Sequence, residues 1–410
     1  MSDIVIIGGG IIGGAITYNL FERGFNGHVT VLEKNNQLAQ ESTSLSAGGF
    51  RNIWSTEVNL KLTNHSIKAF REFKDRLGIN IGFEQIGYLF TYYEDDWQDI
   101  VDFKPVWDKN DVNTELIKPE DIRKLVPGFK HGTDHIDPEE NEILNMKPIA
   151  GGLFGPDCGA FNPTTCATGY FEYTRDKFRE NLDIKLNATV KKILIDSNNE
   201  VEGVKLINDE IITCKTVILA AGAWSSEILA NSTDEDDYHL PVLPWKRQLF
   251  TVKMPKIEGF EHIPMTIIDN GVYFRPEAGN ILAGRADNDQ AFGFETEPDP
   301  HYYEEQMNYY MSARIPGMEY CRIVSKASMW GGLYAHNTKD KNAIIGYHPD
   351  IDNLFLATGF SGHGVMEAPA VGLAVSEKIM DDKYITIPEV EQLGFERIRE
   401  NALIKETIVI

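Results

Sequence analysis

The sequence predicts an α/β protein with two domains: one built on a largely parallel sheet with helices, the other an α+β domain with a mostly antiparallel sheet. Three observations predict this fold. A buried strand, a glycine-rich turn and a helix open the chain, similar strand-to-glycine turns recur far downstream, and strand-rich stretches lie between them. The 410 residues suffice for two or three domains.

The N-terminal elements form one unit. Residues 3–7 are continuously apolar, as in a strand buried on both faces, and they lead into a glycine-rich turn at 8–14. A helix with apolar residues at helical spacing follows and ends at Gly24, and 28–33 has the composition of a second strand. This order of elements is typical of a Rossmann-like domain.

The middle of the chain carries weaker signals. Apolar spacing predicts an amphipathic helix over 59–77, and composition predicts a strand over 87–93. The acidic stretch 95–150 is interrupted by prolines, so we expect only short elements there. Helical periodicity returns over 166–181, and 190–220 alternates as short strands.

The last third of the chain returns to the first domain. Residues 241–330 are rich in strands, and 354–358 is a buried strand that ends in the glycine-rich turn 359–364, with a helix running on to about Met380. The Rossmann-like domain is therefore discontinuous.

We expect the domain boundaries to follow this alternation. The first domain is predicted to comprise 1–86, 152–228 and 337–410, and the second to comprise 87–151 and 229–336.

The formal net charge of −23 disfavours two classes of partner. An acidic field repels phosphate backbones and anionic lipids, so we expect neither nucleic acid nor a membrane surface. We see no targeting signal and no apolar run near the roughly 18 residues that cross a bilayer, so we expect a cytoplasmic protein without membrane insertion.

Metal and disulfide sites are not expected. The four cysteines lack CxxC spacing. His131, Asp134 and His135 lie in a predicted loop, where no helical face would align them as ligands.

The first glycine-rich turn has the pattern of a dinucleotide site. Gly8 permits the tight turn, Gly10 a close approach of the backbone to a diphosphate, and Gly13 the packing of the helix. Glu33 follows about 20 residues later, where an acid would bind a ribose hydroxyl and disfavour NADP. The GxxxxGK pattern of a P-loop is missing. This fingerprint alone leaves NAD and FAD as alternatives.

Three further segments favour FAD. These are ESTSLSAGGFR at 41–51, AAGAWS at 220–225 and GFSGHG at 359–364, and they resemble the family of D-amino-acid oxidase, glycine oxidase and sarcosine oxidase, whose members depend on FAD. Residues 42–49, 273–275 and 330–346 resemble a mitochondrial branch of that family most closely. In the third motif, backbone donors and a helix N-terminus would face the flavin pyrimidine ring, where negative charge develops on reduction.

The resemblance and the glycine turn together predict the cofactor contacts. They are Gly8, Gly10, Ile11, Ile12, Gly13, Glu33, Lys34, Ser42, Thr43, Ala47, Gly48, Gly49, Val190, Ala221, Gly222, Trp224, Gly332, Gly362, His363, Gly364, Val365 and Met366. We interpret His363 as a residue that packs against the cofactor rather than as a base.

The chain departs from the family at four positions. Leu45 and Gly332 stand where some relatives carry a histidine or cysteine that binds FAD covalently, so the resemblance implies non-covalent FAD. Met366 replaces a lysine that grips the substrate carboxylate in sarcosine oxidases, and Leu282 replaces a lysine that assists oxygen reduction. A dehydrogenase therefore becomes as plausible as an oxidase.

Arginines are the candidates for binding an anionic substrate. Arg51 is the first choice because its loop resembles the one beside the flavin, and Arg275 and Arg285 are alternatives. Tyr273 matches the family's active-site tyrosine, and Tyr334 and His336 are expected on the other side of the flavin.

The resemblance implies oxidation of the C–N bond of a small amino or imino acid by hydride transfer to flavin N5. Substrates of the sarcosine, N-methyl amino acid, proline, glycine and D-amino acid types fit, with oxygen, a protein or a quinone as electron acceptor. A flavin-bearing assembly factor or electron-transfer subunit with little turnover is the alternative, and an oligomer or a complex subunit is compatible with both. An NAD-dependent dehydrogenase is a third hypothesis and would be colourless.

Overall fold

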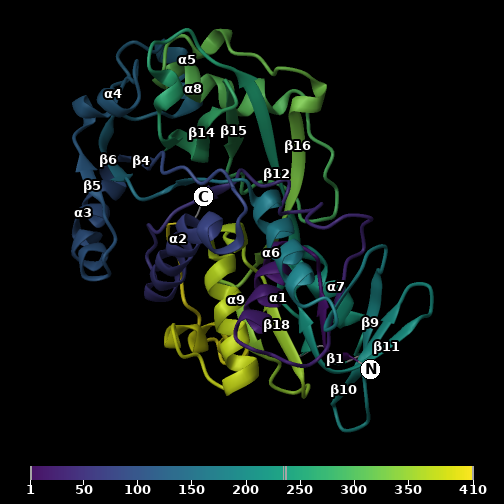
Figure 1. The fold of residues 1–410 in the computed structure, drawn as a ribbon. Coiled ribbons are helices and arrows are strands. Elements are labelled where there is room, and N and C mark those ends of the chain that lie inside the picture. The colour runs from purple at the N-terminus through teal and green to yellow at the C-terminus, as the bar shows by residue number, and fades with distance from the viewer. Residues whose placement is uncertain (1, 234, 236–237, 409–410) are drawn as a thin grey trace.

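The computed structural model describes residues 2–233, 235 and 238–408 and contains two large sheets (Figure 1). The first, in the lower part of Figure 1, has the order β17-β18-β11-β1-β2-β8, and β9 and β10 extend it as a hairpin beside β11. Its strands are β1 (Ser2–Ile7), β2 (Val29–Leu32), β8 (Leu182–Lys185), β9 (Val190–Ile195), β10 (Val201–Leu206), β11 (Ile211–Leu219), β17 (Ile344–Tyr347) and β18 (Leu354–Thr358). The path from β18 to β8 is parallel throughout.

The second sheet forms the upper part and has the order β16-β12-β15-β14-β13-β4-β6-β5. Every pair in it is antiparallel except β13 with β4. Its strands are β4 (Tyr88–Tyr93), β5 (Glu115–Ile117), β6 (Ile149–Gly155), β12 (Val242–Lys253), β13 (Met265–Ile267), β14 (Val272–Glu277), β15 (Asn280–Arg285) and β16 (Met329–Asn337). The short strands β3 (Gly49–Phe50) and β7 (Gly159–Ala160) pair separately. The predicted α/β fold class is confirmed.

Helices surround both sheets. They are α1 (Ile11–Glu22), α2 (Glu57–Leu77), α3 (Glu94–Lys109), α4 (Ile122–Leu125), α5 (Pro138–Leu144), α6 (Pro163–Lys177), α7 (Ser225–Ala230), α8 (Tyr309–Arg314), α9 (Gly364–Asp381) and α10 (Glu396–Arg399). Helix α1 packs very closely on α9, because a Cβ at Gly372 would lie 2.4 Å from the Ala15 carbonyl oxygen. Among the described helices, none combines the length and apolarity that crossing a bilayer requires.

The expectation of only short elements over 95–150 was wrong, because α3 has 16 residues. Three acidic residues in its first turn stabilise the N-terminus, and Pro105 is tolerated within the helix. Ile100 and Trp107 are buried, and the Trp107 indole N–H donates to the Trp54 carbonyl at 2.9 Å. Tertiary packing therefore outweighs the weak local signal.

The strands divide between the sheets largely as the domain prediction requires, although β6 continues to Gly155 and so crosses the predicted boundary at 151/152. The boundaries themselves stay a prediction.

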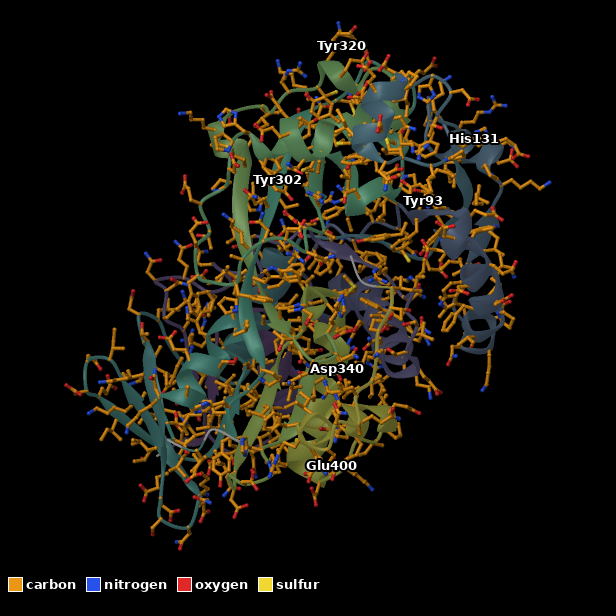
Figure 2. The ribbon with its side chains drawn as sticks, turned by 180° about the vertical axis from the view of Figure 1, so that it is seen from behind. Tyr93, His131, Tyr302, Tyr320, Asp340 and Glu400 are labelled. Carbon is orange, nitrogen blue, oxygen red and sulfur yellow. The ribbon has the colours of Figure 1, made fainter. Side chains whose placement is uncertain are left out.

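The C-terminal segment folds back over the first domain. Asp340, in the lower part of Figure 2, forms a buried ion pair with Arg397 at 2.8 Å. Further along, the buried Glu406 carboxylate accepts hydrogen bonds from the Ser55 hydroxyl at 2.6 Å and the Thr56 hydroxyl at 2.8 Å. This segment therefore holds the chain just before α2.

Candidate functional site

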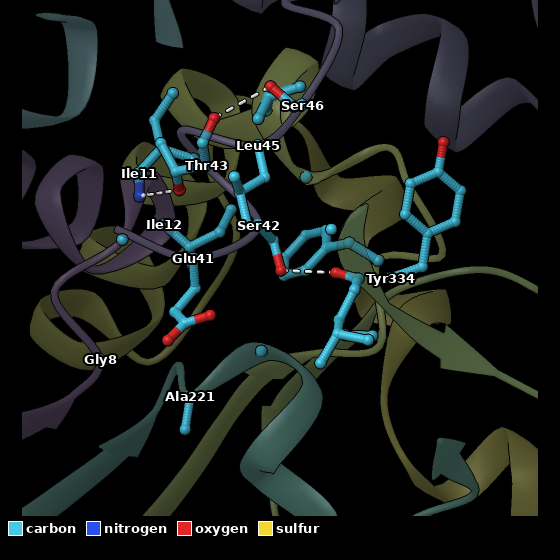
Figure 3. Close-up of a pocket in the computed structure, with 18 of the residues that line it drawn as sticks. Gly8, Ile11, Ile12, Glu41, Ser42, Thr43, Leu45, Ser46, Ala221 and Tyr334 are labelled. Atoms are coloured by element: carbon cyan, nitrogen blue, oxygen red, sulfur yellow. Dashed lines mark hydrogen bonds between the residues drawn. The ribbon is translucent and has the colours of Figure 1, made fainter. Parts of the chain in front are cut away.

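The sequence motifs meet at one edge of the first sheet. Ile7 of β1 is in register with Leu32 of β2 and with Leu219 of β11, and Leu219 is in register with Leu356 of β18. The loops after these parallel strands carry the motifs, so segments far apart in the sequence converge. A cavity of about 530 Å³ lies there, lined also by residues of the second sheet. Figure 3 shows part of its lining.

The three glycines of the first turn have different surroundings. Gly8 has φ +119°, and a Cβ there would lie 2.3 Å from the Ala220 carbonyl oxygen. A Cβ at Gly13 would lie 2.1 Å from the Gly8 carbonyl oxygen. Gly10 lines the cavity, and its Cβ would meet only the Thr43 hydroxyl oxygen, at 3.2 Å. Gly8 and Gly13 are thus required by backbone contacts of the fold, whereas a side chain at Gly10 would press only on the Thr43 hydroxyl, which is a side-chain group.

The start of α1 and the end of β2 supply complementary polar groups. No described side chain caps helix α1, and Gly10, Ile11 and Ile12 at its start line the cavity. The Ile11 N–H donates to the Thr43 hydroxyl at 3.1 Å. The Glu33 carboxylate is buried and accepts from the N–H groups of Gly9 at 2.9 Å and Asn35 at 2.8 Å. It lines the same cavity. This pairing of donors with an acid fits a dinucleotide diphosphate and ribose.

The loop 41–49 is fixed to both domains (Figure 3). The Ser42 hydroxyl donates to the Leu333 carbonyl on β16 at 2.5 Å. The Ser46 hydroxyl donates to the Thr43 carbonyl at 3.0 Å, and Glu41 pairs with Lys34, whose ammonium lies 3.9 Å above the Trp224 ring. These contacts hold the loop in place as one wall of the cavity.

The start of α9 provides a second helix N-terminus at the cavity. His363 directly precedes the helix, and its buried Nε2 has no hydrogen-bond partner in the described part of the chain. Burial lowers the pKa of His363 well below its usual range, so the ring is neutral at physiological pH. A Cβ at Gly362 would lie 2.5 Å from the Tyr334 ring. The unpaired imidazole and the helix donors fit a polar ring system in the cavity.

Two buried arginines line the cavity without an ion pair to a described carboxylate. Arg51 is 2% exposed and donates to the carbonyls of Ile53 and Ile408, the latter at 2.6 Å. Arg247 is 7% exposed. Other buried arginines have acid partners: Arg275 with Glu277, Arg314 with Asp269 and Arg397 with Asp340. Arg285 is also buried without an ion pair to a described acid, but it lies outside the cavity lining, so Arg51 and Arg247 are the cavity's buried arginines without such a pair.

Most of the predicted contacts line the cavity. These are Gly8, Gly10, Ile11, Ile12, Glu33, Lys34, Ser42, Thr43, Ala47, Gly48, Gly49, Arg51, Val190, Ala221, Gly222, Trp224, Tyr273, Gly332, Tyr334, Gly362, His363, Gly364, Val365 and Met366. Their roles stay predictions.

Four predicted or alternative site residues do not line the cavity. Gly13 lies behind the turn. Arg275 donates twice to the Ala47 carbonyl and so supports the cavity wall, Arg285 donates to Asn270 and Gln306, and the His336 ring packs on Trp245 with 4.4 Å between ring centroids. Whether these residues contact a ligand stays a prediction.

Tyr88 and Arg247 also line the cavity and were missed from the sequence. The alternation of β12 offered a signal, because Arg247 and Leu249 point to the same side of that strand and both line the cavity. Tyr88 gave no comparable signal. Its hydroxyl occupies the space that a Cβ at Gly49 would fill, at 1.8 Å.

Two of the departures from the family lie side by side. Leu45 and Gly332 both line the cavity, and a Cβ at Gly332 would lie 3.0 Å from that of Leu45. Neither offers a nucleophile. Met366 lines the cavity, whereas Leu282 does not.

One buried acid directly follows the cavity residue Met366. Glu367 is 1% exposed, and its Oε1 has no hydrogen bond to any residue that the structure describes. Burial, reinforced by the Glu406 carboxylate and opposed by the Arg51 guanidinium, raises the pKa of Glu367 to about 8. The carboxyl is therefore protonated at neutral pH.

This raised pKa predicts a pH-dependent stability. Between about pH 4.5 and about pH 8, Glu367 keeps its proton in the folded chain but has released it in the unfolded chain. The free energy of unfolding therefore falls by about 1.4 kcal/mol for each unit by which the pH rises in this range. Glu367→Gln is expected to remove this fall, as measured by denaturant unfolding at about pH 5 and about pH 8. The control Glu377→Gln alters an acid on α9 that binds the backbone of Ile385 and Thr386, and it should destabilise at both pH values. An unchanged slope in Glu367→Gln would contradict the assignment.

The sequence is similar to a known family and to several known proteins. The family model described as DAO, FAD dependent oxidoreductase, matches residues 3–378. The chain is 29% identical to FAD-dependent oxidoreductase domain-containing protein 1 of Xenopus laevis, covering 100% of this chain and 85% of that protein. It is 26% identical to the 4-methylaminobutanoate oxidase (formaldehyde-forming) of Paenarthrobacter nicotinovorans, covering 92% of this chain and 43% of that protein.

The structure is similar to that of L-proline dehydrogenase from P. horikoshii. The TM-score is 0.82 at 28% sequence identity, with 98% of this chain and 99% of that chain covered.

Proposed function

Because the chain belongs to the DAO family of FAD-dependent oxidoreductases, we propose that it binds FAD non-covalently and oxidises the C–N bond of a small amino or imino acid. The observation that best supports this proposal is that the same cavity is lined by the dinucleotide motifs and by Arg51, which is buried and forms no ion pair with a described acid.

The lining residues would hold FAD in three parts. The turn from Gly8 to Ile12 would bind the diphosphate, Glu33 a ribose hydroxyl, and the start of α9 with His363 the flavin ring. FAD, when bound, would supply the two-electron acceptor for the substrate C–N bond. Leu45 and Gly332 at the attachment positions support non-covalent binding.

The other end of the cavity suits a carboxylated amine. Arg51 forms no ion pair with a described acid, so the guanidinium hydrogens that do not bind the Ile53 and Ile408 carbonyls can bind a substrate carboxylate. Tyr88 and Tyr273 are buried, and desolvation raises the pKa of both phenols, so they act as neutral hydrogen-bond donors. Orientation of the substrate carbon then carries most of the catalysis, and no base of the protein is required.

The names of two relatives indicate secondary amines as the substrate class. Proline and 4-methylaminobutanoate, the compounds in the names of two relatives, each combine a secondary amine with a carboxylate. We therefore rank imino acids and N-methyl amino acids above primary amino acids.

Anaerobic reduction of the flavin tests the proposal. The purified yellow protein is mixed without oxygen with sarcosine, other N-methyl amino acids, proline, glycine and D-amino acids. At least one carboxylated secondary amine is expected to bleach the visible flavin band, whereas the matching amides and alcohols, which cannot pair with Arg51, should not. Readmission of air then separates an oxidase from a dehydrogenase. If every amine leaves the band unchanged, the enzymatic proposal fails and a role as a flavin-bearing assembly or electron-transfer subunit gains support.

A further inference from the structure

Arg247 is a second buried cation of the cavity, separate from Arg51. It lies on β12, and its guanidinium stacks on the Trp245 ring, 3.7 Å from the centroid. Its Nη1 donates to the carbonyls of Lys246 at 3.1 Å and Asp287 at 2.9 Å. Its buried Nε has no partner among the described residues. The side chain is therefore fixed in place, and a residue with a buried, unpartnered donor lines the cavity.

Asp287 attracts the Arg247 charge electrostatically, but the two residues form no ion pair. The Asp287 carboxylate accepts hydrogen bonds from the Tyr302 hydroxyl at 2.7 Å, the Gln290 amide at 2.9 Å and the Asp289 N–H at 2.9 Å. Tyr302, labelled in Figure 2, lies in the upper domain. Arg247 contacts only the carbonyl oxygen of Asp287, and guanidinium stays protonated even when burial lowers its pKa. A buried charge without a counter-ion is unfavourable, so this position suits an anion.

The two arginines lie on different segments and contact different aromatic rings. Arg51 stacks on Trp54 at 3.5 Å, and Tyr88 interacts electrostatically with both Arg51 and Tyr334. The Arg247 guanidinium lies 5.0 Å from the centroid of the Tyr334 ring and also interacts with Tyr273. The two guanidinium groups thus stack on different aromatic rings, and each lines the cavity without an ion pair to a described acid.

We propose that Arg247 binds a second carboxylate, so that the substrate is an amino or imino acid with two acidic groups. This inference rests on the proposed function for the identity of the amine, but the anion site itself is a property of the cavity. An acid on the side chain or on the nitrogen substituent would satisfy Arg247 while Arg51 holds the α-carboxylate.

Binding of unreactive acids to the flavin-loaded protein tests the second site. Dicarboxylates from malonate to adipate are compared with monocarboxylates of the same carbon number, and dissociation constants are measured by calorimetry and by perturbation of the flavin spectrum. At the best chain length the dicarboxylate is expected to bind about 10- to 100-fold more tightly. Arg247→Met should abolish this preference and leave the monocarboxylate constants unchanged, and Arg247→Lys should retain part of it.

Arg285→Met is the matched control, because Arg285 is also a buried arginine but lies outside the cavity lining. It should keep the dicarboxylate preference. Three outcomes would overturn the proposal: no preference at any length in the unmodified protein, a preference that survives Arg247→Met, or one that Arg285→Met also removes. Slower flavin reoxidation in Arg247→Met with unchanged binding would instead assign Arg247 to the electron acceptor. Because these acids are not oxidised, a failed amine screen counts only against the proposed function.

Discussion

Arg51→Met is expected to lower kcat/KM for the carboxylated amine by about 10- to 100-fold, mainly by raising KM, while the protein keeps its flavin. Arg51 is 2% exposed, lines the cavity and has no described acid partner, so its loss removes the charge that would hold the substrate carboxylate. Stopped-flow reduction of the flavin at increasing substrate concentration separates the binding constant from the rate of reduction.

The controls for Arg51 separate substrate binding from support of the fold. Arg51 also donates to the Ile53 and Ile408 carbonyls, so Arg51→Lys keeps the charge but loses the bidentate geometry and should give an intermediate loss. Arg285→Met, outside the cavity, should leave the kinetics near those of the unmodified protein. Equal kinetics in Arg51→Met and the unmodified protein would remove Arg51 from the site.

Local signals explain which parts of the fold could be predicted. The glycine turn, α1 and β2 are contiguous, and Gly24 and Gly78 end α1 and α2 in the left-handed region, as a glycine after apolar helical spacing indicates. The convergence of the motifs also followed, because parallel strands place the loops after their carboxyl ends at one edge.

Long-range contacts explain what could not be predicted. Arg275 and Arg247 are both strand arginines, and only the tertiary structure shows that one supports the Ala47 carbonyl while the other lines the cavity. Glu406 lies about 350 residues from Ser55 and Thr56, and no local pattern indicates that its carboxylate binds them. Such pairings depend on how distant elements pack, which periodicity does not encode.

The glycines of the first turn allow cofactor binding to be separated from folding. Gly10→Ala is expected to weaken FAD binding by about 10- to 100-fold, because the added methyl group enters the cavity where the diphosphate would approach the backbone. The cofactor-free protein should lose about 1 kcal/mol of stability or less, since the only close neighbour of that methyl group is the Thr43 hydroxyl, at 3.2 Å. Flavin titration of the cofactor-free protein and its thermal midpoint measure the two effects.

Gly13→Ala is the matched variant with the opposite expectation. Its methyl group would lie 2.1 Å from the Gly8 carbonyl oxygen, which is backbone and cannot rotate away, so α1 must shift from β1. The cofactor-free Gly13→Ala protein should therefore unfold at a clearly lower temperature than Gly10→Ala, and it should lose flavin as a consequence of that shift. Retention of FAD by Gly10→Ala with an unchanged dissociation constant would mean that the diphosphate does not lie against this turn. The placement of the cofactor, and with it the position of Arg51 relative to the reacting carbon, would then have to be revised.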